Sequence, residues 1–178
     1  MVIMNTETIH TNQSLYEKAA SVLEQVMDPE IPVISVTDLG IVRKIEVSEK
    51  ADRKQVTVTV TPTYTGCPAL DRIRMDIYQA LIKAGFDEVN INEVLTPAWT
   101  TDWLTPEGAE KLKAYGIAPP TAVQPVCDLE LFGKDEAIQC PRCNSFNTRL
   151  VSRFGSTPCK ALYSCDDCKE PFDYFKCH

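Results

Sequence analysis

Four cysteines near the C-terminus have the spacing of a metal site. Cys140 and Cys143 form one C-x2-C pair, and after 21 residues Cys165 and Cys168 form a second pair. Each pair places two sulfurs in one tight turn, so two such turns can complete a tetrahedron of thiolates around a metal ion. We therefore predict a small zinc-ribbon domain over residues 138–178. Its site is structural, because protein sulfurs fill all four positions.

The cysteine pattern alone also allows alternatives to zinc. Iron in a rubredoxin-like site uses the same four thiolates, and buried thiols can have this spacing by chance. A redox C-x-x-C needs only one pair, usually at the start of a helix. Three potential ligands remain in this region: Cys159, Cys177 and His178. They are either a buried thiol and an exposed tail, or a second, adjustable ligand group that helps to pass on a metal or cluster.

A second candidate for chemistry is the cysteine in the sequence Thr63-Tyr64-Thr65-Gly66-Cys67-Pro68. Proline after the cysteine predicts that Cys67 lies at the start of a helix. Unpaired amide N–H groups and the helix dipole favour an anion there, which predicts a lowered thiol pKa and a thiolate for metal binding or nucleophilic attack. The alternative is a small apolar side chain that caps the helix.

The remaining titratable residues offer little for catalysis. Asp28 and Glu30 in a proline-rich loop, and Asp38 before Leu39, are acids of the kind that most often cap turns or face water. The two histidines, His10 and His178, are both near the ends of the sequence, and there is no GxxxxGK[ST] or GxGxxG motif. This argues against a self-sufficient hydrolase, kinase or dehydrogenase.

The elements that must hold these residues follow from hydrophobic periodicity. Apolar residues at helical spacing predict helices over 14–27, with Ser14 and Glu17 as a capping box, and over 68–84. Strict alternation in Val56–Val60 predicts a strand with one buried face. We expect further strands at 41–47 and 89–95, with the charged segment 49–54 as a hairpin turn. This order predicts an α+β fold, a small domain with helices on one side of a sheet.

The chain after the third predicted strand divides into three parts. The segment TPAWTTDWLT (96–105) is irregular and aromatic, and Thr105-Pro106-Glu107 then opens a short helix that stops at Gly116. Residues 117–137 have little periodicity and are predicted to be a linker to the ribbon. The predicted organisation is a flexible N-terminus (1–13), a first domain (14–116), this linker (117–137) and the ribbon (138–178).

Charge and composition narrow the function classes. The net charge is −7. Residues 1–137 contain 12 basic and 21 acidic side chains, whereas residues 138–178 contain 6 basic and 4 acidic side chains. An acidic main body argues against nucleic-acid binding, which relies on neutralising phosphates. We find neither a signal peptide nor the roughly 20 consecutive apolar residues of a membrane span. We expect a cytoplasmic protein, in which eight cysteines, six of them in residues 138–178, indicate metal binding rather than disulfides.

Two sets of sequence stretches resemble known families. Residues 28–42 (DPEIPVISVTDLGIV) and 61–68 (TPTYTGCP) resemble the small domain of SufT-type iron–sulfur assembly factors. Residues 97–120 (PAWTTDWLTPEGAEKLKAYGIAPP), followed by CPRC, FGSTPCKALYSC and EPFDYFKC, resemble the PaaD family. Those are accessory proteins of the bacterial phenylacetyl-CoA 1,2-epoxidase system in phenylacetate degradation. Together the similarity covers about residues 14–178.

The resemblance implies a protein that does not itself catalyse the oxygenation. It implies a role in maturing or loading iron–sulfur or di-iron centres of partner subunits, with structural Zn²⁺ in the ribbon. The reactive cysteine of the family maps onto Cys67, and its acidic loop maps onto Asp28 and Glu30. Because one thiolate cannot hold a cluster that needs four ligands, a transient cluster must borrow ligands from a second copy, a partner, or Cys127 or Cys159.

Two rival functions remain. The protein is either a structural subunit of the epoxidase complex, with the ribbon and the segment of Trp99 and Trp103 as docking surfaces, or a thiol enzyme that uses Cys67 as nucleophile. The lack of an internal histidine makes the thiol enzyme the weakest of the three hypotheses.

Overall fold

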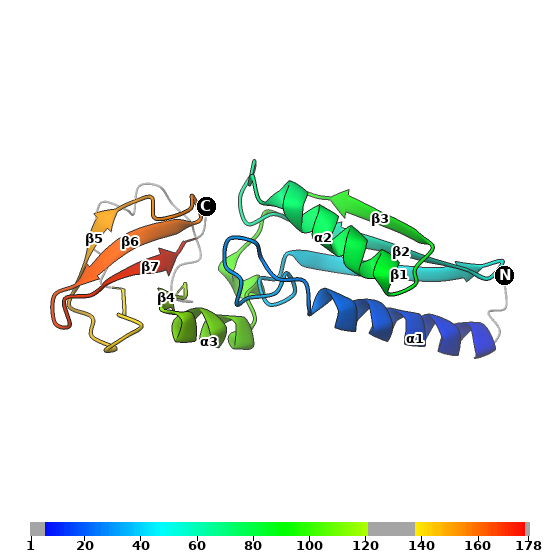
Figure 1. The fold of residues 1–178 in the computed structure, drawn as a ribbon, viewed down its shortest axis with the longest axis horizontal. Coiled ribbons are helices and arrows are strands. Elements are labelled where there is room, and N and C mark those ends of the chain that lie inside the picture. Colours follow the sequence, from blue (N-terminus) through cyan, green and yellow to red (C-terminus); the bar gives the residue numbers. More distant parts are fainter. Residues whose placement is uncertain (1–5, 121–137, 177–178) are drawn as a thin grey trace. The chain divides into compact units, whose positions relative to one another are not determined.

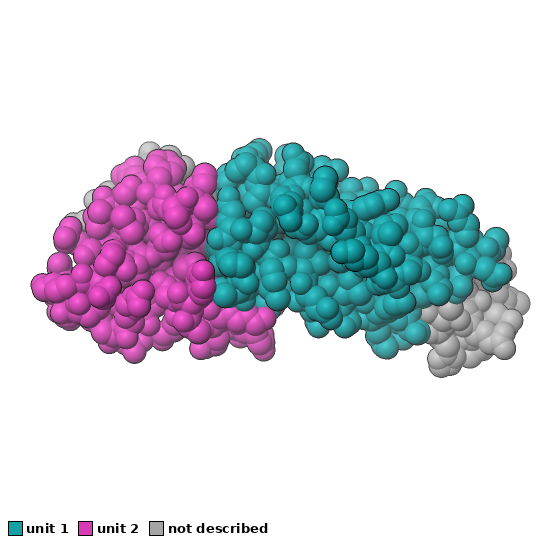
Figure 2. Space-filling model, viewed as in Figure 1, with its two compact units in different colours: residues 1–99 teal, residues 100–178 magenta. Residues whose placement is uncertain are grey.

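The computed structural model describes residues 6–120 and 138–176, and it divides the chain into two compact units (Figure 1). The first unit is Met1–Trp99 and the second is Thr100–His178, coloured teal and magenta in Figure 2. Together they contain three α-helices and two sheets among the described residues, so the predicted α+β class is confirmed. None of the described helices has the length and apolar character that a bilayer crossing needs.

The first helix, α1 (Thr6–Leu23), begins eight residues before its predicted start. Ser14 therefore lies inside the helix, and the capping-box interpretation is wrong. The Glu17 carboxylate instead accepts a hydrogen bond from Gln13 at 2.9 Å, one turn earlier. Once a helix is nucleated, each added residue gains a backbone hydrogen bond at little cost, and this i,i+4 pair supports the extension. The predicted flexible segment 1–13 is thus helical from Thr6 onward.

A three-stranded sheet in the order β1-β2-β3 forms the centre of the first unit. Strands β1 (Val42–Lys50) and β2 (Arg53–Val60) are antiparallel, and β3 (Glu88–Glu93) runs parallel to β2. The hairpin turn consists of Ala51 and Asp52 alone, with φ of 50° and 61°. Two successive positive φ angles are the geometry of a tight type I′ turn, so both strands extend further into the charged segment than predicted.

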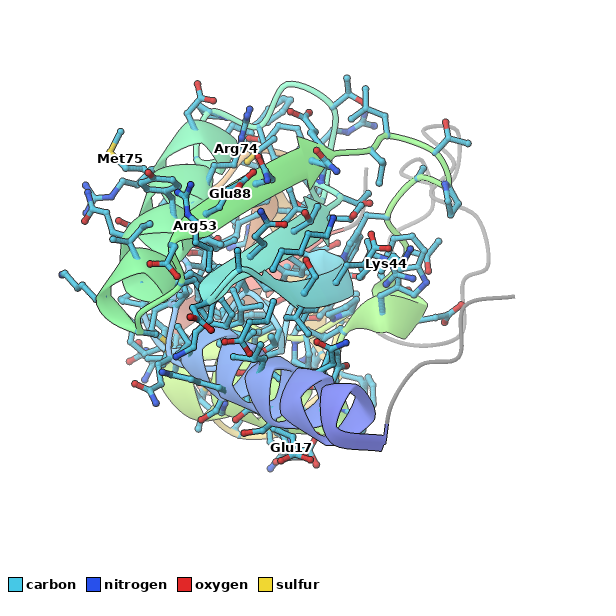
Figure 3. All side chains as sticks on the ribbon, turned by 90° about the vertical axis from the view of Figure 1, so that its right-hand side faces the viewer. Glu17, Lys44, Arg53, Arg74, Met75 and Glu88 are labelled. Atoms are coloured by element: carbon cyan, nitrogen blue, oxygen red, sulfur yellow. The ribbon has the colours of Figure 1, made fainter. Side chains whose placement is uncertain are left out.

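One face of this sheet is buried by helices. Val56, Val58 and Val60 are at most 1% exposed, as their alternation predicts. Helix α2 (Leu70–Lys83) buries the residues of one stripe, Leu70, Ile73, Ile77 and Leu81. Helices α1 and α2 contact each other and the outer strands β1 and β3. Figure 3 shows Glu17 and Met75 pointing away from the molecule on the outer sides of these helices, and Met75 is 57% exposed.

The second unit begins with a 3₁₀ turn, a short helix and a two-residue strand. After a 3₁₀ turn, η1 (Thr101–Trp103), helix α3 (Pro106–Tyr115) starts as predicted, with Thr105 Oγ1 accepting a hydrogen bond from the Gly108 amide at 2.9 Å. It ends at Gly116, whose φ is 94°. The following β4 (Ile117–Ala118) pairs in parallel with β7 (Pro171–Phe175) of the ribbon.

The predicted domain boundary and linker start are therefore corrected. Ile117 and Ala118 are 4% and 1% exposed, because these apolar residues gain burial by adding a strand to the ribbon sheet. The division between units lies at Trp99/Thr100 rather than after Gly116. The remainder of the predicted linker, residues 121–137, lies outside the described residues.

The ribbon sheet has the strand order β4-β7-β6-β5. Besides β4, its strands are β5 (Thr148–Ser152), β6 (Lys160–Cys165) and β7 (Pro171–Phe175), and β6 is antiparallel to both β5 and β7. A small core contains Ile138, Ala161, Tyr163 and Phe172 together with two of the cysteines. The rings of Tyr163 and Phe172 stack with centroids 5.9 Å apart, and Tyr174 packs edge-on against Tyr163 at 5.8 Å. This core lies directly beside the predicted metal site.

Candidate metal and thiol sites

The structure brings together the four cysteines of the ribbon. All four sulfur atoms lie within 4.8 Å of one another. The sulfurs of Cys140 and Cys168 are 3.8 Å apart, and those of Cys143 and Cys165 are 3.6 Å apart. A tetrahedral metal with metal–sulfur bonds of about 2.3 Å requires sulfur–sulfur edges of roughly 3.8 Å. The thiol positions therefore fit one tetrahedral ion with no open coordination position.

The two cysteine pairs are built as equivalent turns. The amide of the first cysteine in each pair bonds the carbonyl five residues later: Cys140 to Ser145 at 2.8 Å, and Cys165 to Glu170 at 3.0 Å. The residue after each second cysteine has a left-handed backbone, with φ of 61° at Asn144 and 65° at Lys169. This left-handed residue reverses the chain, so each turn aims both of its sulfurs at the same point.

The electrostatics of the cluster favour a bound cation. The backbone amide of Cys168, followed by that of Asp167, lowers the pKa of the Cys165 thiol to about 7. The Glu170 amide also favours a thiolate at Cys168, but burial and the neighbouring sulfurs outweigh it and raise the pKa of Cys168 to about 12. Without a cation between them, four thiolates packed this closely would repel one another, so the four thiols resist complete ionisation. A dication removes this repulsion and allows all four to bind as thiolates.

A carboxylate that the sequence did not single out connects the two turns. Asp167 accepts hydrogen bonds from the Ser145 hydroxyl and, at 2.7 Å, from the Asn147 amide, both beside the first cysteine pair. These bonds lower the pKa of Asp167, Ser145 having the largest effect. The aspartate thus holds the first turn against the second. Its role could not be predicted from the sequence, since the two segments are 20 or more residues apart.

In the first unit, Cys67 lies just before α2 with its sulfur against the start of that helix. Helix α2 begins at Leu70, and its N-cap Ala69 provides no side-chain cap. The Leu70 amide donates to the Cys67 carbonyl at 3.2 Å, and the amides of Ala69 and Leu70 together with the Tyr64 hydroxyl favour a thiolate at the half-buried Cys67. The backbone carbonyl of Cys67 therefore accepts from the start of the helix, and its thiol lies where negative charge would be stabilised.

The predicted lowering of the Cys67 pKa is wrong. Burial has the largest effect and raises the pKa of the Cys67 thiol above its ordinary value, and the charge of Glu30 adds to this rise. The hydrogen bonds from Ala69, Tyr64 and Leu70 act in the opposite direction but do not compensate. Cys67 is consequently a protonated thiol at neutral pH, surrounded by donors that could stabilise the thiolate after its proton is displaced.

The two acids of the proline-rich loop have different surroundings. Asp28 is buried, and its Oδ1 accepts hydrogen bonds from the amides of Glu30 and Ile31, both at 2.8 Å. The Glu30 side chain is half-buried and close enough for its charge to act on the Cys67 thiol. Asp28 thus shapes the loop, and Glu30 is the acid that this loop brings near Cys67.

The other candidates have structural surroundings. Asp38 accepts a hydrogen bond from the Ser35 amide at 3.1 Å, and the Ser35 hydroxyl accepts one from the Asp38 amide at 3.0 Å, a reciprocal cap. Trp99 is only 4% exposed, with its indole N–H donating to the Leu39 carbonyl at 2.8 Å. The expectation that Trp99 forms a docking surface is therefore wrong, because its ring is part of the core; Trp103 is half-buried.

Cys159 lies within the ribbon at a distance from the four-cysteine cluster. It is 6% exposed and its sulfur is 3.0 Å from the Thr157 hydroxyl. It is not among the residues whose sulfurs meet at the metal site. Cys127, Cys177 and His178, the other residues considered as additional ligands, lie outside the described residues.

Comparisons with known proteins agree with this division into two parts. Residues 124–176 match the model of the PaaD zinc beta ribbon domain, and residues 17–92 match that of an iron-sulfur cluster assembly protein. A solved structure of a domain of unknown function, DUF59, from Bacillus anthracis has a TM-score of 0.51 at 24% identity. It covers 58% of this chain and 96% of that domain, and this likeness shows the fold alone.

Two curated relatives extend the match. An Fe-S protein maturation auxiliary factor of Porphyromonas gingivalis (strain ATCC BAA-308 / W83) is 34% identical over 61% of this chain and 97% of its own length. A protein of Escherichia coli (strain K12), named as a component of 1,2-phenylacetyl-CoA epoxidase, is 47% identical over 88% of this chain and 90% of its own. The chain therefore belongs to the PaaD family of 1,2-phenylacetyl-CoA epoxidase components, and joins an iron–sulfur assembly domain to a zinc-ribbon domain.

Proposed function

We propose that this protein is a non-catalytic accessory factor of the phenylacetyl-CoA 1,2-epoxidase system, which loads iron–sulfur or di-iron centres into partner subunits in the cytoplasm. The observation that carries the proposal is the half-buried Cys67 thiol just before α2, where the amides of Ala69 and Leu70 and the Tyr64 hydroxyl favour its thiolate form. Iron, alone or in a cluster, is the cargo of this site rather than a resident cofactor.

The surroundings of Cys67 suit transient binding. An incoming iron must displace the thiol proton, so the site is closed to weak cations until a metal with strong affinity for sulfur arrives. The hydrogen bonds then stabilise the thiolate and withdraw charge from its sulfur, which weakens the bond to iron and favours release. Asp28 holds the loop, and Glu30 is the second group offered to the cargo.

The ribbon has a different part in this proposal. Its four cysteines hold Zn²⁺ as a structural ion, whose saturated coordination leaves no position for oxygen or substrate. No histidine lies among residues 12–120 or 138–176, so no described residue in these ranges pairs with Cys67 as an imidazole base. This supports transfer of a metal centre rather than turnover of a substrate.

A second candidate function is a structural subunit that stays in the epoxidase complex. It is favoured by the exposed aromatic rings of the ribbon, Phe146 at 59% and Phe154 at 67% exposure. Exposed aromatic side chains are enriched in protein–protein interfaces. A factor that only visits its partners also needs a docking surface, so this observation is compatible with both functions.

The two functions are separated by the time at which the protein is needed. The other epoxidase components are produced in cells with this protein, purified free of it, and assayed on phenylacetyl-CoA. We expect them to remain active, whereas components produced without it contain less iron and do not recover quickly when the purified protein is added. Activity that instead rises with added protein to a fixed stoichiometry, with fully metallated partners, would show a structural subunit.

A further inference from the structure

The loop between β5 and β6 holds one aromatic ring outside the ribbon. Phe154 on this loop is 67% exposed, the largest value among the exposed large hydrophobic side chains of the described residues. A single exposed hydrophobic residue is common on protein surfaces and by itself indicates nothing. The unusual feature is the set of contacts that fixes residues 152–156, which we call the Phe154 tip.

Hydrogen bonds close the backbone of the Phe154 tip. The Ser152 hydroxyl donates to the Phe154 carbonyl at 2.8 Å and accepts from the Phe154 amide at 3.2 Å. The Gly155 amide donates to the Lys160 carbonyl at 2.8 Å, which joins the tip to β6. A Cβ on Gly155 would lie 2.8 Å from Asp173 Oδ1, so glycine allows the loop to pack this closely. The tip therefore has a defined backbone conformation.

A buried lysine supports the Phe154 ring itself. Lys176 is 6% exposed, and its ammonium donates to the Arg153 carbonyl at 2.6 Å. The same Nζ lies 4.4 Å from the centroid of the Phe154 ring, which is within cation–π distance. Lysine is seldom buried because its charge loses hydration, and here a carbonyl and a ring face replace the water. The cation thus holds both the backbone of the tip and the ring.

A second buried lysine fixes the tip to the sheet. Lys160 is 5% exposed, and its Nζ lies 3.4 Å from Asp173 Oδ2. The same carboxylate oxygen accepts a hydrogen bond from the Ser156 hydroxyl at 3.2 Å. One ion pair therefore joins β6, β7 and the tip. Two buried ammonium groups thus support a loop whose central side chain, Phe154, buries little of its own surface.

A rigid exposed ring is well suited to anchor a protein–protein contact. Aromatic side chains that fill a pocket on the partner contribute much of the binding energy in many interfaces, and a ring that is already fixed loses little conformational entropy on binding. We propose that the Phe154 tip is a docking anchor, whose ring enters an apolar pocket rimmed by carboxylates on one of the other epoxidase components. The inference rests on the proposed function for the identity of the partner.

The charge around the tip indicates the acidic rim. Residues 152–160 and 171–176 contain three basic side chains, those of Arg153, Lys160 and Lys176, and one acidic side chain, that of Asp173. This local excess of positive charge contrasts with the net charge of −7 of the whole chain. Arg153 is the exposed member of the three. A basic point on an acidic protein attracts an acidic surface to that point and so orients the approach of the partner.

The test measures binding of the full chain, with its ribbon zinc in place, to each of the other epoxidase components purified separately. Biolayer interferometry at low and high salt gives the dissociation constants. Size exclusion with light scattering gives the mass of the chain alone. We expect one component to bind, with an affinity that falls as salt increases, because opposite charges meet at the rim of the pocket.

Variants of the tip are compared with matched changes elsewhere. Phe154→Ala should weaken binding by about tenfold or more. Phe146→Ala removes a ring that is 59% exposed in the same ribbon and should leave binding unchanged. Arg153→Glu should weaken binding most at low salt, whereas Lys83→Glu makes the same charge change on α2 and should not. Unchanged zinc content and urea unfolding show that each variant is folded.

Lys176→Met tests the support of the ring. This change keeps an apolar stem but removes the ammonium that holds the Arg153 carbonyl and the Phe154 ring. Binding should weaken by less than in Phe154→Ala, although the ring is still present. Binding as tight as that of the unaltered chain would contradict the argument that a fixed ring is what the partner recognises.

The outcomes separate docking from iron loading. Normal binding by Phe154→Ala, an equal loss in Phe146→Ala, or no binding of any component would overturn the docking anchor and leave iron loading at Cys67 standing. A dimer of the chain alone that Phe154→Ala dissociates would show that a second copy is the occupant, which also overturns the proposal. Loss of binding in Phe154→Ala, with normal iron in components produced without this protein, would support the anchor and remove iron loading.

Discussion

The ribbon cluster and the Cys67 thiol differ in how much of a metal site each contains. The ribbon has four sulfurs within 4.8 Å of one another, anchored by two equivalent turns and a buried aromatic core. Cys67 is a single sulfur at the start of α2, with hydrogen-bond donors around it and one acid nearby. A complete ligand set holds its metal permanently, whereas an incomplete set can accept a metal and pass it on. On the function proposed above, the chain separates a structural ion from a transferable one.

The largest effect is expected from breaking the complete site. Cys140→Ser or Cys168→Ser should abolish metal binding at the ribbon and unfold it, because ion binding contributes on the order of 10 kcal/mol to the folding of such small domains. Zinc at about one per chain in the unaltered protein and almost none in the variants, with new protease cleavage after residue 138, is the expected result. Full zinc content and an unchanged cleavage pattern in Cys165→Ser would contradict the assignment.

The same kind of change at the incomplete site should leave the fold intact. Cys67→Ala keeps the backbone carbonyl that accepts from the Leu70 amide and removes only a half-buried sulfur, so it should cost about 1 kcal/mol of stability. Iron binding should be lost completely. Urea unfolding followed by metal analysis measures both quantities, with Cys67→Ser as the control that keeps an oxygen acceptor. A Cys67→Ala chain that binds iron normally would show that this thiol does not bind the metal.

The acidity of Cys67 offers a third comparison. Because burial raises its pKa, Cys67 should be almost wholly protonated at neutral pH, and its labelling rate should increase with pH up to that raised pKa. Iodoacetamide labelling of Cys67 should therefore be slower in the native chain than in the chain unfolded by urea at the same pH. Faster labelling of the native chain at about pH 6 would mean that the hydrogen bonds outweigh burial.

The smallest effect concerns the aspartate that connects the two cysteine turns. Asp167→Asn keeps the side-chain shape but removes the charged acceptor for Ser145 and Asn147. We expect zinc affinity to fall by about tenfold, measured by competition with a chromogenic chelator. Since the carboxylate pKa is lowered, its contribution is present at neutral pH and is lost as pH falls through that pKa. At pH values below the pKa of this carboxylate, the unaltered protein and Asp167→Asn should release zinc to the same extent. A difference in zinc release that persists at such pH values would contradict this role of Asp167.

Much of the architecture could be predicted from the sequence, because local patterns determine it. The cysteine spacing identified the four ligands, and the alternation of Val56–Val60 and the helical stripe of α2 identified buried faces. Two of the errors arose where the deciding interaction is distant in sequence. Ile117 and Ala118 resembled a linker because their partner, β7, lies more than 50 residues later. Trp99 resembled a docking residue because its hydrogen bond to Leu39 spans 60 positions.

The chemistry of Cys67 was harder to predict for a related reason. Its position at a helix start and the helix dipole can be deduced from Gly66 and Pro68, and both favour the thiolate. Burial and the charge of Glu30, which outweigh them, depend on how the loop after α1 folds over the start of α2. A sequence can thus indicate that a thiol has unusual surroundings more readily than it can give the direction of the pKa shift.

The iron content of the partner subunits tests most directly whether Cys67 passes iron to other proteins. The other epoxidase components are produced in cells that contain equal amounts of either the unaltered protein or Cys67→Ala, then purified and analysed for iron. We predict that partners made with Cys67→Ala contain markedly less iron, although the variant itself is folded and retains its ribbon zinc. Equal iron in both sets of partners would contradict a role for this thiol in iron transfer.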